Sequence, residues 1–208
     1  MRAVFLFLLL VLAPVQAWAG DLAVTVRDSA GKPVANAVVT VYPASGIPKG
    51  PIRFAWPLTV AQQNIQFDPF VLVAPVGASV SFPNRDKVQH HVYSFSAGNK
   101  FELKLFGKDE SRSVAFKAVG VAAIGCNIHD QMVGYVKVVD TPFAIKTGAD
   151  GVASLRGLPA GQVTIRVWHP WLRAPKNESS MAFALPATGV ARPAISLEIR
   201  RPAGGHMH

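Results

Sequence analysis

The alternation of apolar and polar residues is the strongest pattern in this chain. It marks two strands near the start, at residues 22–26 and 38–42, on either side of a turn that contains Gly31 and Pro33. Period-two alternation is typical of half-buried strands, and a Gly/Pro turn between two such runs predicts a β-hairpin or two adjacent strands. The stretch that follows, 44–57, is rich in glycine and proline and predicts a connecting loop.

The centre of the chain predicts a denser series of short strands. These segments are apolar or alternating and are bounded by turn residues: 65–67, 70–73, 79–82, 91–95, 101–105, 113–116, 119–124 and 135–139. About eight such strands predict a sandwich or barrel. A third zone begins at residue 143 and contains an alternating strand at 162–168 and a last one at 195–199. The whole pattern predicts an all-β protein.

The first 19 residues differ from the rest of the chain. Arg2 is followed by an uncharged run over 3–15 and by the small-x-small sequence Ala17-Trp18-Ala19. This order predicts a secretory signal peptide at residues 1–19, with an uncleaved anchor as the alternative. We therefore expect a mature protein that begins near Gly20 and works in the periplasm.

The charge of the chain is strongly basic, with a formal net charge of +9. The basic residues are scattered, and no nucleic-acid-binding motif appears among them, so we expect no nucleic-acid partner. In an exported protein such charge favours association with an acidic protein partner or with a membrane complex or anionic surface. Solubility alone accounts equally well for most of these side chains.

Residues 126–132 (CNIHDQM) carry the most informative chemistry. Cys126 is the only cysteine of the chain, so it has no partner for an intramolecular disulfide. His129 and Met132 follow at intervals of three residues, and His90 and His91 stand at the start of a predicted strand upstream. A thiolate, two imidazoles and a thioether are the donors of a blue-copper site, so the sequence predicts one copper ion per chain.

Other candidate groups are weaker. The tail at 202–208 is predicted to be flexible, and its sequence His206-Met207-His208 offers further copper donors or simply a solvated end. We interpret His169 as a packing residue at a strand end, and Asp86 lies in a turn sequence that requires no catalytic role. No P-loop, nucleophile elbow or metalloprotease helix is present, and we predict that the protein is not an enzyme.

The segments around these donors resemble the cupredoxins, and amicyanin most closely. The Cys-x2-His-x2-Met spacing and residues 81–92 (SFPNRDKVQHHV) carry the resemblance, which covers roughly 67–139. It implies a Greek-key β-sandwich with the metal ligands His90, Cys126, His129 and Met132. Cupredoxins usually have Asn after the first ligand His, where this chain has His91, so His91 stays open as an alternative ligand. We hypothesise a hydrogen bond between His91 and Asn127.

A second resemblance concerns the two ends of the mature chain. Residues 24–41 and 147–170 resemble the two halves of a carboxypeptidase regulatory-like, or transthyretin-like, sandwich. The resulting division is given by residue ranges: outer sandwich 20–57 and 141–201, copper domain 58–140, tail 202–208. The alternative is a simple string of a short β arm, the metal domain and a small C-terminal sandwich.

The function implied by the cupredoxin resemblance is single-electron transport by a blue copper protein. The resemblance extends to exported chains labelled methylamine utilization proteins. The expected partner is a redox protein such as a cytochrome or a periplasmic dehydrogenase. Two alternatives remain: a module for copper delivery or storage, and a structural β-sandwich without an electron-transfer role.

Overall fold

The computed structural model describes residues 19–200, and this range confirms the all-β prediction. It contains no α-helix, only a short 3-10 turn at Pro175–Asn177. None of the described helical segments is long and apolar enough to cross a membrane. The predicted signal peptide and the predicted tail at 202–208 lie outside the described residues, apart from the last residue of the former.

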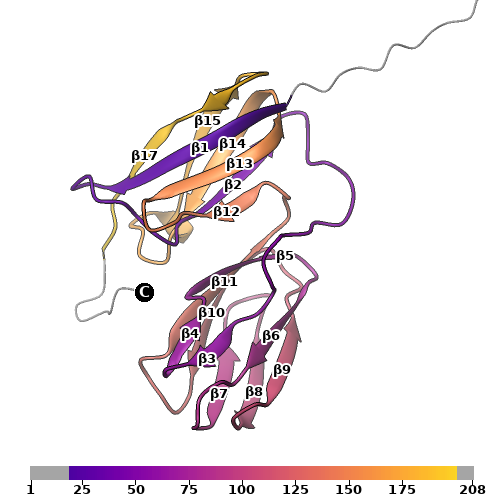
Figure 1. Ribbon diagram of the computed structural model, residues 1–208, viewed down its shortest axis with the longest axis vertical. Helices are drawn as coiled ribbons and strands as arrows, with labels where there is room; N and C mark the ends of the chain where they lie inside the picture. The colour runs from indigo at the N-terminus through magenta and orange to yellow at the C-terminus, as the bar shows by residue number, and fades with distance from the viewer. Residues whose placement is uncertain (1–18, 201–208) are drawn as a thin grey trace, which may run out of the picture.

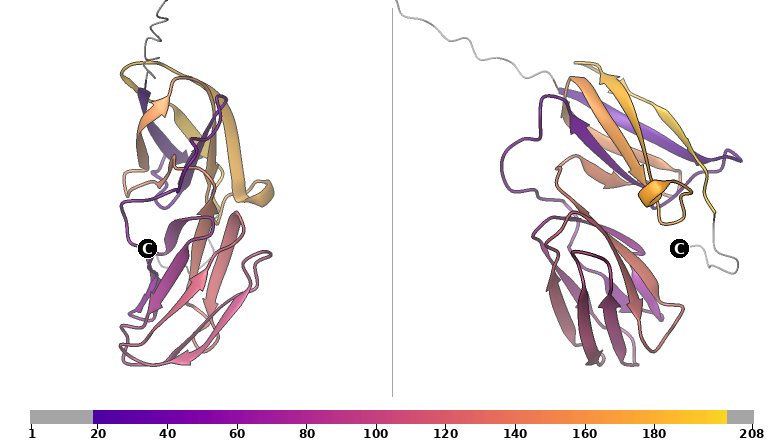
Figure 2. Two further views of the ribbon diagram at one scale, coloured as in Figure 1. Left: turned by 90° about the vertical axis from the view of Figure 1, so that its right-hand side faces the viewer. Right: turned by 180° about the vertical axis from the view of Figure 1, so that it is seen from behind.

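The strands form two groups stacked along the long axis, which we call the upper lobe and the lower lobe after Figure 1. Figure 2 shows the same separation from two further sides. The upper lobe consists of β1 (Ala19–Asp28), β2 (Val38–Pro43), β12 (Ala144–Lys146), β13 (Val152–Pro159), β14 (Gly161–Trp168), β15 (Glu178–Leu185), β16 (Val190–Ala191) and β17 (Ala194–Leu197). The lower lobe consists of β3 (Ala61–Gln63), β4 (Gln66–Asp68), β5 (Val71–Pro75), β6 (Ser79–Pro83), β7 (His90–Ser94), β8 (Phe101–Phe106), β9 (Ser111–Ala115), β10 (Gly120–Cys126) and β11 (Val133–Val139).

The upper lobe is built from two sheets that share one aliphatic core. One sheet has the order β13-β1-β16, with β17 also pairing with β1, and the other has the order β12-β2-β14-β15. Alternate residues of both sheets, such as Val24, Val39 and Ile165, are fully buried between them. Burial of one face of each strand is what the period-two pattern predicts.

The lower lobe is dominated by a five-stranded sheet of order β5-β11-β10-β7-β8. Two further two-stranded sheets, β6-β9 and β3-β4, complete the lobe. The core of the lobe is rich in phenylalanine. Phe82, Phe106 and Phe116 are all buried, and Cys126 and Met132 belong to the same cluster. The two sulfur-containing side chains therefore lie in the core of this lobe.

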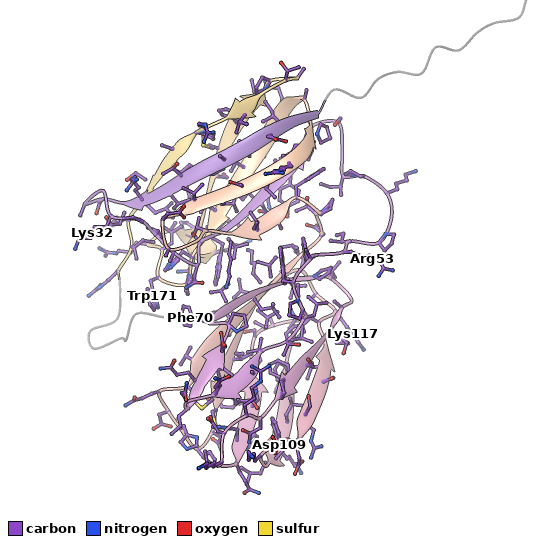
Figure 3. The ribbon with its side chains drawn as sticks, in the orientation of Figure 1. Lys32, Arg53, Phe70, Asp109, Lys117 and Trp171 are labelled. Atoms are coloured by element: carbon purple, nitrogen blue, oxygen red, sulfur yellow. The ribbon has the colours of Figure 1, made fainter. Side chains whose placement is uncertain are left out.

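A third apolar cluster joins the two lobes. Val71, Val73 and Val139 of the lower lobe pack with Val38 and Trp168 of the upper lobe. Figure 3 labels two side chains of this junction, Phe70 and Trp171, whose ring centroids are 5.7 Å apart. The end of β11 thus packs against the upper lobe.

The structure corrects one expectation about strand pairing. The strands predicted at 22–26 and 38–42 exist as parts of β1 and β2, but they form neither a hairpin nor an adjacent pair. They belong to different sheets that face each other across the upper core. Alternation identifies a strand without identifying its partner, and here each strand pairs with segments more than 100 residues later in the chain.

The chain enters and leaves the lower lobe through two neighbouring strands of the upper lobe. β2 leads into the lower lobe and β12 leads out of it, and these strands pair with Thr40 opposite Ala144. The upper lobe therefore draws on both ends of the described chain. The division into an outer sandwich at 20–57 and 141–201 and a copper domain at 58–140 stays a prediction.

Candidate metal centre

Three of the predicted metal ligands are brought together at one end of the lower sheet. His90 is the first residue of β7, and Cys126 is the last residue of β10. These strands are antiparallel neighbours, with Cys126 opposite Val92, so the two ends that carry the donors meet. His129 lies in the short connection between β10 and β11.

The connection between β10 and β11 is closed by its own backbone. The Met132 amide donates to the carbonyl of His129 at 2.9 Å, and the Cys126 amide donates to the carbonyl of Met132 at 3.3 Å. These bonds fold the segment back on itself, so that His129 faces the end of β7. The ring centroids of His90 and His129 are 5.0 Å apart.

The donor atoms form a compact, largely buried set. The Sγ atom of Cys126 lies 3.7 Å from Nδ1 of His90 and 3.7 Å from Nδ1 of His129, and all three donors are within 4.8 Å of one another. His90 and Cys126 are buried, whereas His129 is partly exposed. Such a set combines a thiol with two imidazole nitrogens in a space of the size that one ion requires.

These separations are compatible with one metal ion held between the three donors. Metal–sulfur and metal–nitrogen bonds of about 2.3 and 2.0 Å, separated by an angle of about 120°, place the two donors roughly 3.7 Å apart. The separation of 3.7 Å seen at both imidazoles therefore matches a trigonal arrangement around one ion.

Met132 lies close to this set in the fold. Its side chain is buried to 1% exposure and belongs to the same core cluster as Cys126. The thioether of Met132, in the same buried cluster as Cys126, is the remaining donor type of a blue-copper site. The assignment of His90, Cys126, His129 and Met132 as metal ligands stays a prediction.

The neighbouring histidine, His91, points away from the cluster. Its Nε2 lies 3.0 Å from Oε1 of Glu102, although the contact lacks the alignment of a hydrogen bond. The hypothesised bond between His91 and Asn127 does occur, but it joins the backbones: the Asn127 amide donates to the His91 carbonyl at 3.1 Å. Strand parity places His90 inward and His91 outward.

Asp86 is the functional neighbour that sequence reasoning missed. Its Oδ2 accepts a hydrogen bond from Nε2 of His90 at 2.9 Å, on the side of the ring away from Cys126. Burial raises the pKa of this carboxyl, but hydrogen bonds from the Ile65 amide, His90 and the Asn64 amide outweigh that effect and leave the pKa below its ordinary value. No sequence pattern signals this contact, because a spacing of four residues brings side chains together on a helix and this segment is not helical.

The surface around His129 includes exposed apolar side chains. Ile128 is 48% exposed and Val133 is 42% exposed, and they flank the segment that carries His129.

Two cavities lie elsewhere, beside the strands that meet the upper lobe. One of about 360 Å³ is lined by polar side chains such as Asn36, Gln63 and Asp68, and another of about 450 Å³ is mainly apolar. Lys146 lines both, and burial lowers the pKa of its amine. Neither cavity is lined by a donor of the Cys126 cluster.

Comparison with known proteins gives only partial matches. No family model matches the chain, and no curated protein matches it. Among solved structures, a purple cupredoxin from Nitrosopumilus maritimus is 24% identical over 39% of this chain and 98% of its own, with a TM-score of 0.35. A reduced amicyanin mutant is 22% identical over 50% of this chain and 99% of its own, with a TM-score of 0.37. A copper-containing nitrite reductase from Thermus scotoductus SA-01 is 24% identical over 56% of this chain and 28% of its own, with a TM-score of 0.39.

Proposed function

We propose that this protein is an exported type 1 copper protein that carries single electrons between redox partners. The observation that carries the proposal is the equal distance of 3.7 Å from the buried Cys126 sulfur to the two imidazole nitrogens. His90, Cys126 and His129 would hold one copper ion, with Met132 as a weaker fourth ligand. The bound ion would supply the Cu(I)/Cu(II) couple.

The packing of the donors favours electron transfer over catalysis. His90 and Cys126 lie at strand ends and are both buried, Cys126 within the phenylalanine-rich core, so their side chains have little freedom to rearrange when the charge of the site changes. A rigid donor set lowers the reorganisation that accompanies electron transfer. With Met132 as the fourth ligand, the chain leaves no position for a substrate, and we therefore infer that it is not an enzyme.

Burial of the same donors argues against copper delivery. Passing an ion to an acceptor requires that the acceptor reach the ligands, but His90 is 0% exposed and Cys126 is 3% exposed. His129 alone is partly exposed, beside Ile128 and Val133. We propose that an electron partner, such as a cytochrome or a periplasmic dehydrogenase, contacts this edge.

The decisive experiment is to add Cu(II) to the purified apo-protein and record its absorption and electron paramagnetic resonance spectra. We expect an intense blue thiolate-to-copper band and narrow hyperfine splitting, both abolished in Cys126→Ser. A matched histidine pair provides the control: His90→Gly loses the band and regains it with added imidazole, whereas His91→Asn keeps it. A colourless protein, or one with an ordinary tetragonal Cu(II) signal, overturns the proposal.

Measuring two rates then distinguishes electron transport from copper delivery. We expect fast electron exchange between the copper-loaded protein and a cytochrome, and slow loss of copper to a high-affinity chelator. Rapid transfer of copper to the chelator, without electron exchange, would support the delivery function instead.

A further inference from the structure

One carboxylate connects the buried histidine of the cluster to a distant turn of the chain. Asp86 Oδ2 accepts from His90 Nε2 at 2.9 Å and from the Ile65 amide at 3.0 Å, while Oδ1 accepts from the Asn64 amide at 2.7 Å. The Asp86 side chain is only 13% exposed. Its own amide donates to Oδ1 of Asn84 at 2.9 Å, which fixes the backbone from which the carboxylate projects.

The contact with Asp86 determines which nitrogen of His90 carries the proton. An ionised carboxylate only accepts hydrogen bonds, so Nε2 must be the protonated nitrogen of a neutral ring. Nδ1 then keeps its lone pair, and it is Nδ1 that lies 3.7 Å from Cys126 Sγ. The ring is thus held in the tautomer that presents a free donor to the cluster.

The other two bonds of Asp86 stabilise an unfavourable turn. Asn64 and Ile65 join β3 to β4 in a two-residue hairpin loop, and their φ angles are 56° and 57°. A loop with two positive φ angles suits Asn-Gly, whereas the β-branched Ile65 is strained in this region. The carboxylate offsets that strain by accepting both amides of the loop.

We propose that Asp86 is a positioning residue that holds His90 in its Nε2-protonated tautomer and couples the ring to the β3–β4 turn. The consequence for copper rests on the proposed function, in which Nδ1 of His90 is a ligand. A carboxylate bonded to the far nitrogen makes the imidazole a stronger donor and places negative charge near the ion. Both effects favour Cu(II) over Cu(I), so Asp86 lowers the reduction potential.

The first test uses the apo-protein and is independent of copper. Long-range proton–nitrogen spectra of ¹⁵N-labelled protein at pH 8 report the tautomer of each histidine ring. We expect His90 to be purely Nε2-protonated in the wild type and to become a mixture of tautomers in Asp86→Leu. A wild-type His90 protonated at Nδ1, or a pure Nε2 tautomer that survives in Asp86→Leu, overturns the proposal.

A double variant keeps this test informative if Asp86→Leu fails to fold. Ile65→Gly removes the strain at positive φ, so Ile65→Gly/Asp86→Leu needs no carboxylate to form the turn. We expect the double variant to fold with a mixed His90 tautomer. The wild-type spectrum also tests the proposal without any variant, because a His90 ring protonated at Nδ1 would contradict it.

The second test measures Cu(II) and Cu(I) affinities and the reduction potential. Asp86→Asn keeps a side-chain oxygen for His90 but removes the charge, and we expect its Cu(II) affinity to fall about tenfold while its Cu(I) affinity stays the same. A tenfold change corresponds to a potential about 59 mV higher. The matched control is Glu102→Gln, which removes the same charge beside His91, and there we expect little change.

The tautomer spectra and the copper measurements distinguish the positioning role of Asp86 from the proposed function. Equal shifts in Asp86→Asn and Glu102→Gln would reveal a general charge effect and overturn the positioning role. A wild-type protein with the expected tautomer but no copper binding would overturn the proposed function and leave the positioning of His90 by Asp86 standing.

Discussion

The two lobes have cores of different chemistry. The buried residues of the upper core are all valine, leucine, isoleucine or alanine, without a sulfur atom among those that the structure describes. The core of the lower lobe contains four phenylalanines together with Cys126 and Met132, and it lies against the buried His90. Removing core volume is therefore expected to destabilise both lobes but to disturb the donor set in only one.

The largest effect is expected for Phe116→Ala in the lower lobe. Phe116 is 0% exposed and makes an edge contact with Phe101, with ring centroids 5.8 Å apart. Truncating a buried phenylalanine costs about 3–5 kcal/mol of unfolding free energy. Urea denaturation of the apo-protein measures this cost, and absorption after Cu(II) addition should show a weakened band. A full band with unchanged stability would contradict the prediction.

Ile165→Ala is the counterpart in the upper lobe. Ile165 is 0% exposed between the two upper sheets, and its truncation should cost about 2–5 kcal/mol. Because the donors lie in the other core, we expect the copper spectrum of the folded variant to match that of the wild type. A changed copper spectrum would show that truncating a side chain in the upper core also disturbs the donors in the lower core.

The contact between the lobes is tested by Glu178→Gln. Glu178 of β15 accepts from Lys137 of β11 at 2.9 Å, and the lysine side chain is 11% exposed. A hydrogen bond to a charged group contributes about 1.5–3 kcal/mol, and the partial exposure of Glu178 places the expected loss near the lower value.

A double-mutant cycle with Lys137→Met isolates this pair from its surroundings. The exposed pair of Arg173 and Glu198 is the control, since Glu198→Gln should cost at most about 1 kcal/mol. Equal losses of unfolding free energy for Glu178→Gln and Glu198→Gln would mean that partial burial does not strengthen the ion pair at the junction.

The smallest effect is a pH dependence at the junction. Burial, followed by the hydrogen bond to Asp140, raises the pKa of Tyr42 to about 12. A raised acid pKa means that the stabilisation is complete below pH 10 and is lost as the pH rises toward 12. Absorbance of tyrosinate during alkaline titration should show a late component that Tyr42→Phe reduces, while Tyr135, whose pKa burial also raises, still contributes to it. An unchanged titration curve in that variant would exclude Tyr42 as its source.

Local pattern predicted the strands of the lower lobe well. The alternating or apolar runs at 79–82, 101–105 and 135–139 all fall within strands of the structure, because one face of each strand is buried. The same reasoning missed β15, and it placed Ile65 in a strand where the chain turns. Ile65 favours strands intrinsically, but the hydrogen bonds that the Asn64 and Ile65 amides donate to Asp86, 21 residues beyond Ile65, hold it in the turn.

The sequence predicted that His90, Cys126 and His129 would lie together, as they do, but it did not predict their surroundings. Residues 126–132 display three donor types within one short segment, and parity along β7 separates His90 from His91. The role of Asp86 depends on the positions of β3, β4 and β7 together, which no periodicity encodes. A turn residue and a residue that orients a histidine look the same in a sequence.

The pairing of β2 with β12 has a consequence for how the lower lobe unfolds. Thr40 and Ala144 are opposite each other in the upper lobe, so the whole lower lobe is a loop of about 100 residues whose ends are held together. While the upper lobe stays folded, the unfolded lower segment is a closed ring of chain with fewer accessible conformations than a free one. Closing a flexible loop of this length corresponds to about 4 kcal/mol of chain entropy. The half of the molecule that carries the donor cluster thus receives stability from the other half, without any contact at the cluster itself.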